Sequence, residues 1–227
     1  MIPRVKICGL MRRQDVQLCC RLGVDICGFV VGYPAPVPWN LSPGACAALL
    51  PAVRPPARSC IVTGGTPAQV IPLALALRPD LVQLHYRETL ADTAAIVRAL
   101  SPWGIGVVKT VPAAPQERRR QFGTEDAAAI ARALEAAGAV MVLVDGRGAE
   151  DAARGAAADL ALFAQVRRAA ARPVMLGGGI TPDNCRDILA AARPALVDVM
   201  TGVETAPGVK SEEKLARLLA QVQRGWQ

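Results

Sequence analysis

The sequence predicts an α/β protein, a single (β/α)8 barrel over residues 1–227. Short apolar runs alternate about eight times with longer stretches rich in alanine and leucine, which is typical of repeated strand–helix units around a parallel sheet. The chain is 52% hydrophobic and only 4% aromatic, which favours helices packed on a sheet over an all-β sandwich. No glycine-rich nucleotide fingerprint follows the first apolar run, so a closed barrel is favoured over an open doubly wound sheet.

The strands are expected where the apolar runs fall, and helices are expected to fill the intervals. We place strands at residues 5–9, 26–31, 59–62, 81–84, 106–111, 139–144, 174–176 and 196–200. Proline-rich segments at residues 33–38, 54–56 and 112–115 are expected to be loops, because another strand–helix unit follows each of them within a few residues. We therefore expect one domain.

Several expected helix starts carry capping signals. In Ser42-Pro43, Thr66-Pro67 and Thr181-Pro182 a hydroxyl stands before a proline, which caps the helix and places proline at its first position. After Ser211 a pair of glutamates favours the start of the last helix, because negative charge is stabilised at a helix N-terminus. The four signals predict helices that begin at residues 43, 67, 182 and 212.

The net charge of +7 favours anionic substrates but does not predict a nucleic-acid surface. Basic residues are scattered, and none of the basic runs is interleaved with aromatic residues as a stacking surface would need. The longest run, Arg118-Arg119-Arg120, is expected to be a solvated loop or a helix start. No apolar stretch reaches the ~20 residues that cross a bilayer, so we expect neither a nucleic-acid nor a membrane partner.

The seven cysteines form an odd set in apolar contexts, without C-x-x-C spacing. They are Cys8, Cys19, Cys20, Cys27, Cys46, Cys60 and Cys185. This usage predicts reduced thiols in the cytoplasm and not a disulfide framework or a zinc site. The chain opens into an apolar run without the features of a signal peptide, which also predicts a cytoplasmic protein.

Two ionisable groups, Cys8 and Asp145, end the first and sixth expected strands. In a barrel of parallel strands the loops at the carboxyl ends converge on one pocket, so the thiol and the carboxylate are expected to face each other. A catalytic thiol needs a lowered pKa, and Lys6 lies two residues before it on the same strand face. The alternatives are that Cys8 is a small core residue and that Asp145 belongs to a surface turn.

His85 and Lys109 end the fourth and fifth expected strands and add polar groups to the same end of the barrel. A single histidine is more often a hydrogen-bonded structural residue than a catalyst. Together with Cys8 and Asp145, however, these two side chains predict a substrate site at the carboxyl ends of the strands.

Two late glycine-containing segments predict a phosphate site. One holds Gly177, Gly178 and Gly179 after the seventh strand, and the other holds Thr201-Gly202 after the eighth. Glycines let backbone N–H groups approach an anion, and the loops after strands seven and eight of such barrels frequently bind phosphate. The alternative is a tight turn before the next helix. Asp198 is assigned to the same phosphate-binding set, with bracing of the loop as its alternative.

These residues together resemble the phosphoribosylanthranilate isomerase family, whose members are (β/α)8 enzymes of tryptophan biosynthesis. The resemblance extends in the same order over nearly the whole chain. The matching stretches are Lys6-Ile7-Cys8-Gly9-Leu10, Gly23-Val24-Asp25 running to Gly28-Phe29-Val30, Val82-Gln83-Leu84-His85, Leu143-Val144-Asp145, Leu176-Gly177-Gly178-Gly179-Ile180-Thr181-Pro182-Asp183-Asn184, Val197-Asp198-Val199-Met200-Thr201-Gly202-Val203-Glu204 and Pro207-Gly208-Val209-Lys210.

The resemblance implies an Amadori rearrangement of a phosphoribosylated aromatic amine, with no metal and no organic cofactor. By similarity, the thiolate of Cys8 removes the proton from C2 of the sugar, and Asp145 protonates the ring oxygen. One group must be deprotonated and the other protonated, so the pocket has to shift the two pKa values in opposite directions. The expected substrate-binding residues are Lys6, Trp39, His85, Lys109, Arg147 and Arg154.

Two segments depart from the family pattern. Where the family usually carries Ser-Pro-Arg, with the arginine facing the anthranilate carboxylate, this chain has Val37-Pro38-Trp39. The family's Gly-Thr-Gly-Lys stretch after the sixth strand corresponds here to Ala153-Arg154-Gly155-Ala156. The uncharged ring of Trp39 thus stands where the family has an arginine that can make two hydrogen bonds to a carboxylate. Arg147 or Arg154 could supply that contact instead.

Three functions follow from this pattern. The first is phosphoribosylanthranilate isomerase, an intramolecular aldose–ketose isomerase that acts as a monomer or a homodimer. The second is a divergent relative that acts on another phosphorylated sugar with a more apolar aglycone, for which Trp39 would be a stacking wall. The third is a non-catalytic barrel that binds a phosphorylated metabolite, in which Cys8→Ser would leave ligand affinity intact.

Overall fold

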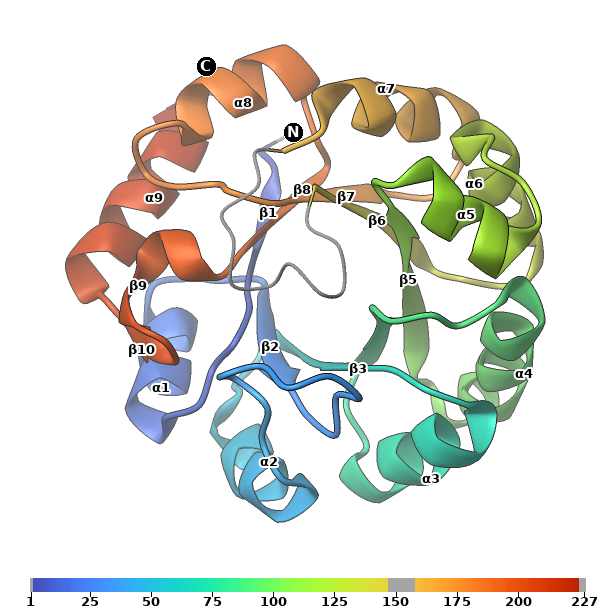
Figure 1. Cartoon of the computed structure of the whole chain (residues 1–227). Helices are drawn as coiled ribbons and strands as arrows, with labels where there is room; N and C mark the ends of the chain where they lie inside the picture. Colours follow the sequence, from blue (N-terminus) through green and yellow to red (C-terminus); the bar gives the residue numbers. More distant parts are fainter. Residues whose placement is uncertain (1, 147–157, 225–227) are drawn as a thin grey trace.

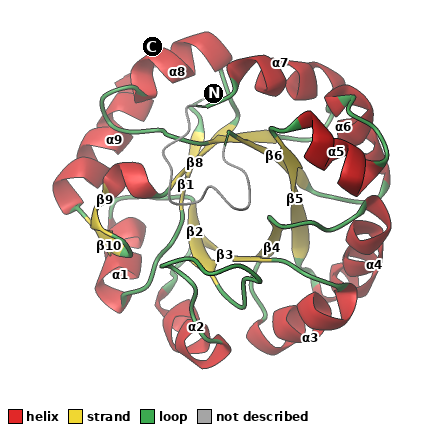
Figure 2. Cartoon of the chain, in the orientation of Figure 1, coloured by secondary structure: helices red, strands yellow, loops and turns green. Residues whose placement is uncertain are grey.

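Eight parallel strands close into a barrel in the computed structural model, which describes residues 2–146 and 158–224 (Figure 1). Each strand pairs with the next along the chain, and β8 pairs back with β1 (Figure 2). The strands are β1 Arg4–Ile7, β2 Ile26–Val30, β3 Arg58–Thr63, β4 Leu81–Leu84, β5 Gly106–Pro112, β6 Met141–Asp145, β7 Val174–Gly177 and β8 Leu196–Val199. The predicted (β/α)8 barrel is confirmed.

The helices form a ring outside the strands (Figure 2). They are α1 Arg13–Arg21, α2 Pro43–Leu49, α3 Pro67–Leu77, α4 Leu90–Leu100, α5 Pro115–Phe122, α6 Ala127–Ala136, α7 Leu160–Ala169, α8 Cys185–Ala192 and α9 Glu212–Arg224. Three short 3-10 helices, η1 Leu50–Ala52, η2 Ser101–Trp103 and η3 Thr201–Val203, and a small hairpin of β9 Glu204–Ala206 and β10 Val209–Lys210 complete the described elements.

Three of the four predicted helix starts are confirmed, at α2, α3 and α9. The fourth is wrong, because α8 begins at Cys185 and not after Thr181. The Thr181 hydroxyl instead accepts hydrogen bonds from the backbone N–H groups of Asp183 and Asn184, which makes a turn ahead of the helix. The run from Arg118 to Arg120 lies in α5, and Arg118 is buried, where its guanidinium donates to carbonyl oxygens.

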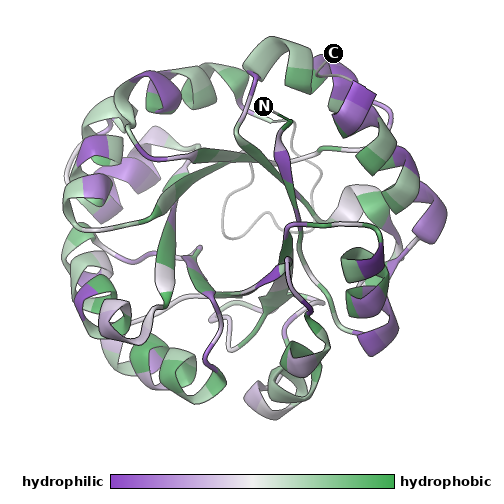
Figure 3. Ribbon diagram, turned by 180° about the vertical axis from the view of Figure 1, so that it is seen from behind, coloured by the Kyte–Doolittle hydropathy of each residue, from purple (hydrophilic) through white to green (hydrophobic). Residues whose placement is uncertain are grey.

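The two faces of the barrel strands form separate cores. Side chains that point into the barrel include an apolar layer from alternate strand positions, whereas the intervening side chains pack outward against the helices. The inward layer consists of Ile26, Cys60, Leu81, Val108, Met141, Leu143, Met175 and Leu196. Figure 3 shows the mostly apolar strands inside a ring of helices that carry both apolar and hydrophilic residues. The inward layer closes the barrel below the carboxyl ends of the strands.

Within residues 2–146 and 158–224 no helix is both long and apolar enough to cross a lipid bilayer. The same ranges hold no group of three or more histidine, cysteine, aspartate or glutamate side chains that could bind a metal ion. All seven cysteines are free.

Candidate active site

Cys8 lies directly beyond β1, buried at the carboxyl end of the barrel. Its backbone N–H donates to the carbonyl of Val199, which ties the residue to the end of β8. Gly28 stands opposite it on β2, where an added Cβ would lie 3.1 Å from Cys8 Sγ and from Lys6 Cε. Glycine is therefore needed at position 28 so that the thiol and the lysine can share the interior of the barrel.

Lys6 and Asp198 form a buried ion pair beside the thiol. They are register partners on β1 and β8, and Lys6 Nζ lies 2.9 Å from both carboxylate oxygens of Asp198. Burial acts to lower the pKa of the Lys6 ammonium, but the negative charges around it, Asp198 first, outweigh burial and raise that pKa above its ordinary value. Lys6 therefore stays protonated next to Cys8.

This pairing corrects the prediction that Asp198 binds phosphate. Its carboxylate is the counterion of Lys6 and is buried on the inward face of β8. A carboxylate would repel a phosphate, and the partner of Asp198 here is the Lys6 ammonium next to Cys8.

The Cys8 thiol is subject to two opposing influences. Burial raises its pKa above the ordinary 9.0, because the thiolate loses hydration, whereas the charge of Lys6 and a hydrogen bond from it act to lower that pKa. Burial outweighs the lysine, so the free protein holds Cys8 mainly as the neutral thiol. Among the groups that act to lower the pKa of Cys8, Lys6 has the largest effect.

Asp145 ends β6 with its side chain directed into the barrel, two residues after the inward-facing Leu143. It is 2% exposed, and one of its carboxylate oxygens lies 3.7 Å from Nε2 of His85, at the end of β4. The structure thus brings Cys8, Lys6, His85 and Asp145 to the same end of the barrel. The prediction that Asp145 lies in the site and not in a surface turn is consistent with this burial.

The glycine segment after β7 packs directly on Asp145. An added Cβ would lie 3.4 Å from a carboxylate oxygen at Gly177, and 3.1 Å from the other oxygen at Gly178. Gly178 and Gly179 have φ angles of +96° and +59°, which side chains disfavour. The glycines thus allow close approach to the Asp145 carboxyl as well as the turn.

The segments after β7 and β8 touch each other. Gly202 packs so tightly on the carbonyl oxygen of Ile180 that no side chain would fit. Thr201 is exposed and begins η3, where backbone N–H groups of the first turn have no partner within the helix. The predicted phosphate-binding segments are thus adjacent at the carboxyl end of the barrel.

Trp39 is buried beside Cys8, and its indole N–H is hydrogen-bonded. Its indole Nε1 donates to Glu204 Oε1 over 2.9 Å, and the same oxygen accepts from Lys210 Nζ at 2.7 Å and from the N–H of Gly208. The ring belongs to an apolar cluster around the thiol. The buried members of that cluster are Cys8, Val30, Tyr33, Trp39, Val62 and Met200.

Glu204 and Lys210 were not predicted as site residues. Their position inside motifs that match the family was the only sequence signal for a place in the site. The hydrogen bond between Trp39 and Glu204 joins residues 165 apart, so local spacing could not predict it.

Lys109 does not face the site, which corrects its predicted role. Its register partners Leu84 and Val142 point outward, and its ammonium lies 2.7 Å from Glu88 and 3.2 Å from Gln121 of α5. Burial lowers the pKa of Lys109, against the opposing charge of Glu88. The prediction failed because side chains alternate along a strand: Val108 and Thr110 point into the barrel, so Lys109 between them points toward the helices. The predicted Arg147 and Arg154 lie outside the described residues.

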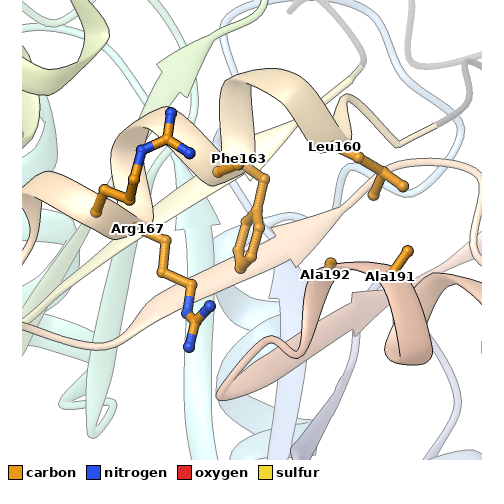
Figure 4. Close-up of a pocket in the computed structure, with 7 residues that line it drawn as sticks. Leu160, Phe163, Arg167, Ala191 and Ala192 are labelled. Atoms are coloured by element: carbon orange, nitrogen blue, oxygen red, sulfur yellow. The ribbon is translucent and has the colours of Figure 1, made fainter.

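A pocket on the outer surface is separate from this site. It lies between α7 and α8 and is lined by Leu160, Phe163, Ala164, Arg167, Arg168, Ala191 and Ala192 (Figure 4). Neither Cys8 nor Asp145 reaches it.

The sequence matches a family model over residues 5–221, and that model is described as N-(5'-phosphoribosyl)anthranilate isomerase. The chain belongs to the phosphoribosylanthranilate isomerase family. A protein of that name from Bordetella petrii is 36% identical over 99% of this chain and 96% of its own length. One from Halobacterium salinarum is 33% identical over 96% of this chain and 95% of its own. The predicted family is confirmed.

Solved structures agree with this family assignment. The phosphoribosylanthranilate isomerase of Thermus thermophilus is 31% identical, with a TM-score of 0.74 over 97% of this chain and 98% of its own. A family structure in complex with reduced 1-(o-carboxyphenylamino)-1-deoxyribulose 5-phosphate has a TM-score of 0.77 over 98% of this chain and 99% of its own, at 24% identity. At that identity the second likeness shows the fold alone.

Proposed function

We propose that this protein is a phosphoribosylanthranilate isomerase, an aldose–ketose isomerase of tryptophan biosynthesis. It would convert N-(5-phosphoribosyl)anthranilate to 1-(2-carboxyphenylamino)-1-deoxyribulose 5-phosphate. The observation that carries the proposal is the inward placement of Cys8 and Asp145 at the carboxyl ends of β1 and β6, in a chain that matches the family over residues 5–221. One group is placed to act as a base and the other as an acid.

The reaction needs proton transfers at four atoms: the ring oxygen, C2, C1 and the oxygen on C2. Asp145 gives a proton to the furanose oxygen, the C1–O bond breaks, and the nitrogen lone pair forms an iminium at C1. Cys8 as thiolate then takes the proton from C2, and the electrons of that C–H bond form the C1–C2 double bond of an enol amine. Protonation of C1 and loss of the enol proton give the ketone. Proton transfer alone completes the rearrangement, so no metal or organic cofactor is required.

Lys6 would support the base directly. Only the thiolate form of Cys8 can accept the C2 proton, and the adjacent ammonium stabilises that form against the effect of burial. Asp198 holds the ammonium in place at 2.9 Å. His85 would position the acid, because its ring lies 3.7 Å from Asp145.

The phosphate of the substrate would bind at the adjacent segments Gly177–Gly179 and Thr201-Gly202, through backbone N–H groups and the Thr201 hydroxyl. A related structure holds a reduced product analogue that carries such a phosphate. We expect the protein to act in the cytoplasm as a monomer or a homodimer, on a small phosphorylated sugar and not on nucleic acid.

An assay with the family substrate tests this function. Phosphoribosylanthranilate is generated from anthranilate and phosphoribosyl pyrophosphate, and its fluorescence is followed after addition of the protein. We expect turnover, and a loss of about 10²–10⁴-fold in kcat for both Cys8→Ala and Asp145→Asn. Cys20→Ala on α1, outside the barrel, is the matched control and should keep full activity. A folded protein without turnover would refute the proposal, and equal rates in all variants would refute the assigned roles.

The environment of Trp39 favours a second candidate, a phosphoribosylated aromatic amine without a carboxylate. The indole N–H is committed to Glu204, so the position of the family arginine offers an apolar ring and no cation. Parallel assays with phosphoribosylanthranilate and phosphoribosylaniline separate the candidates. A higher kcat/KM for the aniline substrate would identify the second one. A Cys8→Ser protein that keeps ligand affinity, beside an unaltered protein that never turns over, would indicate a non-catalytic barrel.

A further inference from the structure

Two inward-facing polar side chains, Gln83 and Thr110, each hold a buried oxygen that no other described residue pairs. Gln83 on β4 is 2% exposed and Thr110 on β5 is 5% exposed. Among the side chains that the structure describes, Oε1 of Gln83 and Oγ1 of Thr110 are the buried oxygens without a hydrogen bond. Buried polar atoms in native proteins are nearly always paired, so these two exceptions call for an explanation.

The strand register places both side chains on the inner face. Gln83 pairs with Val108 and Thr110 pairs with Leu143, and both of these partners belong to the inward apolar layer. Along β4, His85 is the next inward position after Gln83. Along β6, Asp145 is the next inward position after Leu143. The two unpaired oxygens therefore lie one step below the His85–Asp145 pair.

This polar patch faces the catalytic thiol from across the barrel. β1 and β5 are four strands apart in either direction around the closed ring of eight, and they lie on opposite sides of it (Figure 1). Lys6 and Cys8 occupy the β1 side, whereas Gln83 and Thr110 occupy the β4–β5 side. A ligand that spans the carboxyl end of the barrel passes between them.

Branched apolar residues usually fill such inward strand positions. Val would match the shape of Thr110, and Leu would nearly match Gln83, without leaving an oxygen that has lost its hydrogen bonds to water. Two inward polar groups that no described residue pairs, at the end of the barrel that holds Cys8 and Asp145, point to a ligand that pairs them.

We propose that Gln83 and Thr110 bind hydroxyl groups of the sugar chain and so determine specificity for a polyhydroxylated phosphate ester. This inference rests on the proposed function. The phosphate segments lie after β7 and β8, and the apolar cluster around Trp39 extends from the end of β1 over β2 to Val62 on β3. The carbon chain between these two ends carries the hydroxyls on C3 and C4. Gln83 Oε1 accepts from one hydroxyl, and the Thr110 hydroxyl can both donate and accept.

Isosteric apolar variants test the inference through opposite effects on stability and activity. For Thr110→Val and Gln83→Leu we expect an unchanged or higher melting temperature and a fall of about tenfold in kcat/KM. Thr93→Val is the matched control, because this buried threonine on α4 already donates to the carbonyl of Thr89 at 2.8 Å. The control should melt at a lower temperature and keep its kinetics. Unchanged kinetics in Thr110→Val and Gln83→Leu would overturn the proposal.

A binding measurement separates this inference from the proposed function. Calorimetry compares ribulose 5-phosphate with inorganic phosphate, neither of which needs turnover. We expect the Thr110→Val and Gln83→Leu proteins to lose about tenfold in affinity for ribulose 5-phosphate and to bind inorganic phosphate as before. Equal losses for both ligands, or no loss for either, would overturn the proposal. Absence of turnover by the unaltered protein would refute the isomerase function alone.

Discussion

Two buried lysines of this barrel, Lys6 and Lys109, have the same kind of partner and opposite roles. Each lies in a strand and contacts a carboxylate, Asp198 at 2.9 Å and Glu88 at 2.7 Å. The pKa of Lys6 is raised, because the charges around it outweigh burial, whereas burial dominates and lowers the pKa of Lys109. The two side chains point in different directions because side chains alternate along a strand: Lys6 points into the barrel and Lys109 points toward the helices.

The comparison teaches that a polar residue near the end of a strand is not sufficient evidence for a site. The face of the strand decides whether the side chain meets substrate or packs against a helix. The Lys109 ammonium packs near Phe122 and Gln121 of α5, and its ion pair joins the sheet to the loop after β4. We therefore assign Lys6 to catalysis and Lys109 to stability.

The largest expected effect comes from Lys6→Met. Removal of the ammonium leaves Asp198 buried without its counterion and deprives Cys8 of the charge that favours its thiolate. We expect kcat to fall by about 10²-fold or more at neutral pH, and the free energy of unfolding to fall by about 3–5 kcal/mol. Steady-state kinetics and urea unfolding measure the two effects. Full activity in a folded Lys6→Met protein would contradict the assignment.

Lys109→Met is expected to change stability alone. Glu88 would remain buried with its negative charge unpaired, which lowers the free energy of unfolding by about 3–5 kcal/mol. The double variant with Glu88→Gln removes that charge and should recover part of the loss. In both proteins kcat/KM should stay within about twofold of the unaltered value, because neither side chain reaches the substrate. A hundredfold loss of kcat with normal stability would contradict this.

The pH profile distinguishes the two lysines further. Because burial raises the pKa of Cys8 above 9.0, the thiolate fraction, and with it kcat/KM, should increase with pH through the neutral and alkaline range. Lys6 acts to lower that pKa, so Lys6→Met should move the rising limb to higher pH. Lys109→Met should leave the limb in place. A limb that rises and levels off well below pH 9 in the unaltered protein would show that Cys8 is not the titrating base.

The smallest effect is expected for Trp39→Arg, which tests recognition and not proton transfer. An arginine near Glu204 and Lys210 would offer a bidentate donor for the anthranilate carboxylate but would lose the indole hydrogen bond. We expect kcat/KM to shift by about tenfold towards phosphoribosylanthranilate relative to phosphoribosylaniline. An unchanged ratio of the two values would remove Trp39 from the specificity determinants.

The sequence predicted the features that depend on local periodicity. The eight apolar runs predicted the barrel, and the ends of the first, fourth and sixth runs placed Cys8, His85 and Asp145 together at the carboxyl end of the barrel. The start of α8 was missed because Thr181 caps a turn and not the helix. These successes and failures depend on interactions within a few residues.

The remaining features depend on contacts between distant parts of the chain. The pairs Lys6–Asp198 and Trp39–Glu204 are 192 and 165 residues apart, so no spacing rule reveals them. The outward orientation of Lys109 follows from the alternation of side chains along β5, and which positions face inward is fixed by the pairing of β5 with β4 and β6. The missing hydrogen bonds of Gln83 Oε1 and Thr110 Oγ1 can be recognised only when the neighbouring strands are known to be in register.

Release of a tritium label from C2 of the ribosyl group tests the central claim most directly, because it reports the proton that Cys8 is proposed to remove. With phosphoribosylanthranilate labelled at C2, the unaltered protein should release tritium to water in step with turnover. The Cys8→Ala protein should release it at least about 10²-fold more slowly while it stays folded. Release by Cys8→Ala at the unaltered rate would show that another group is the base and would contradict the account.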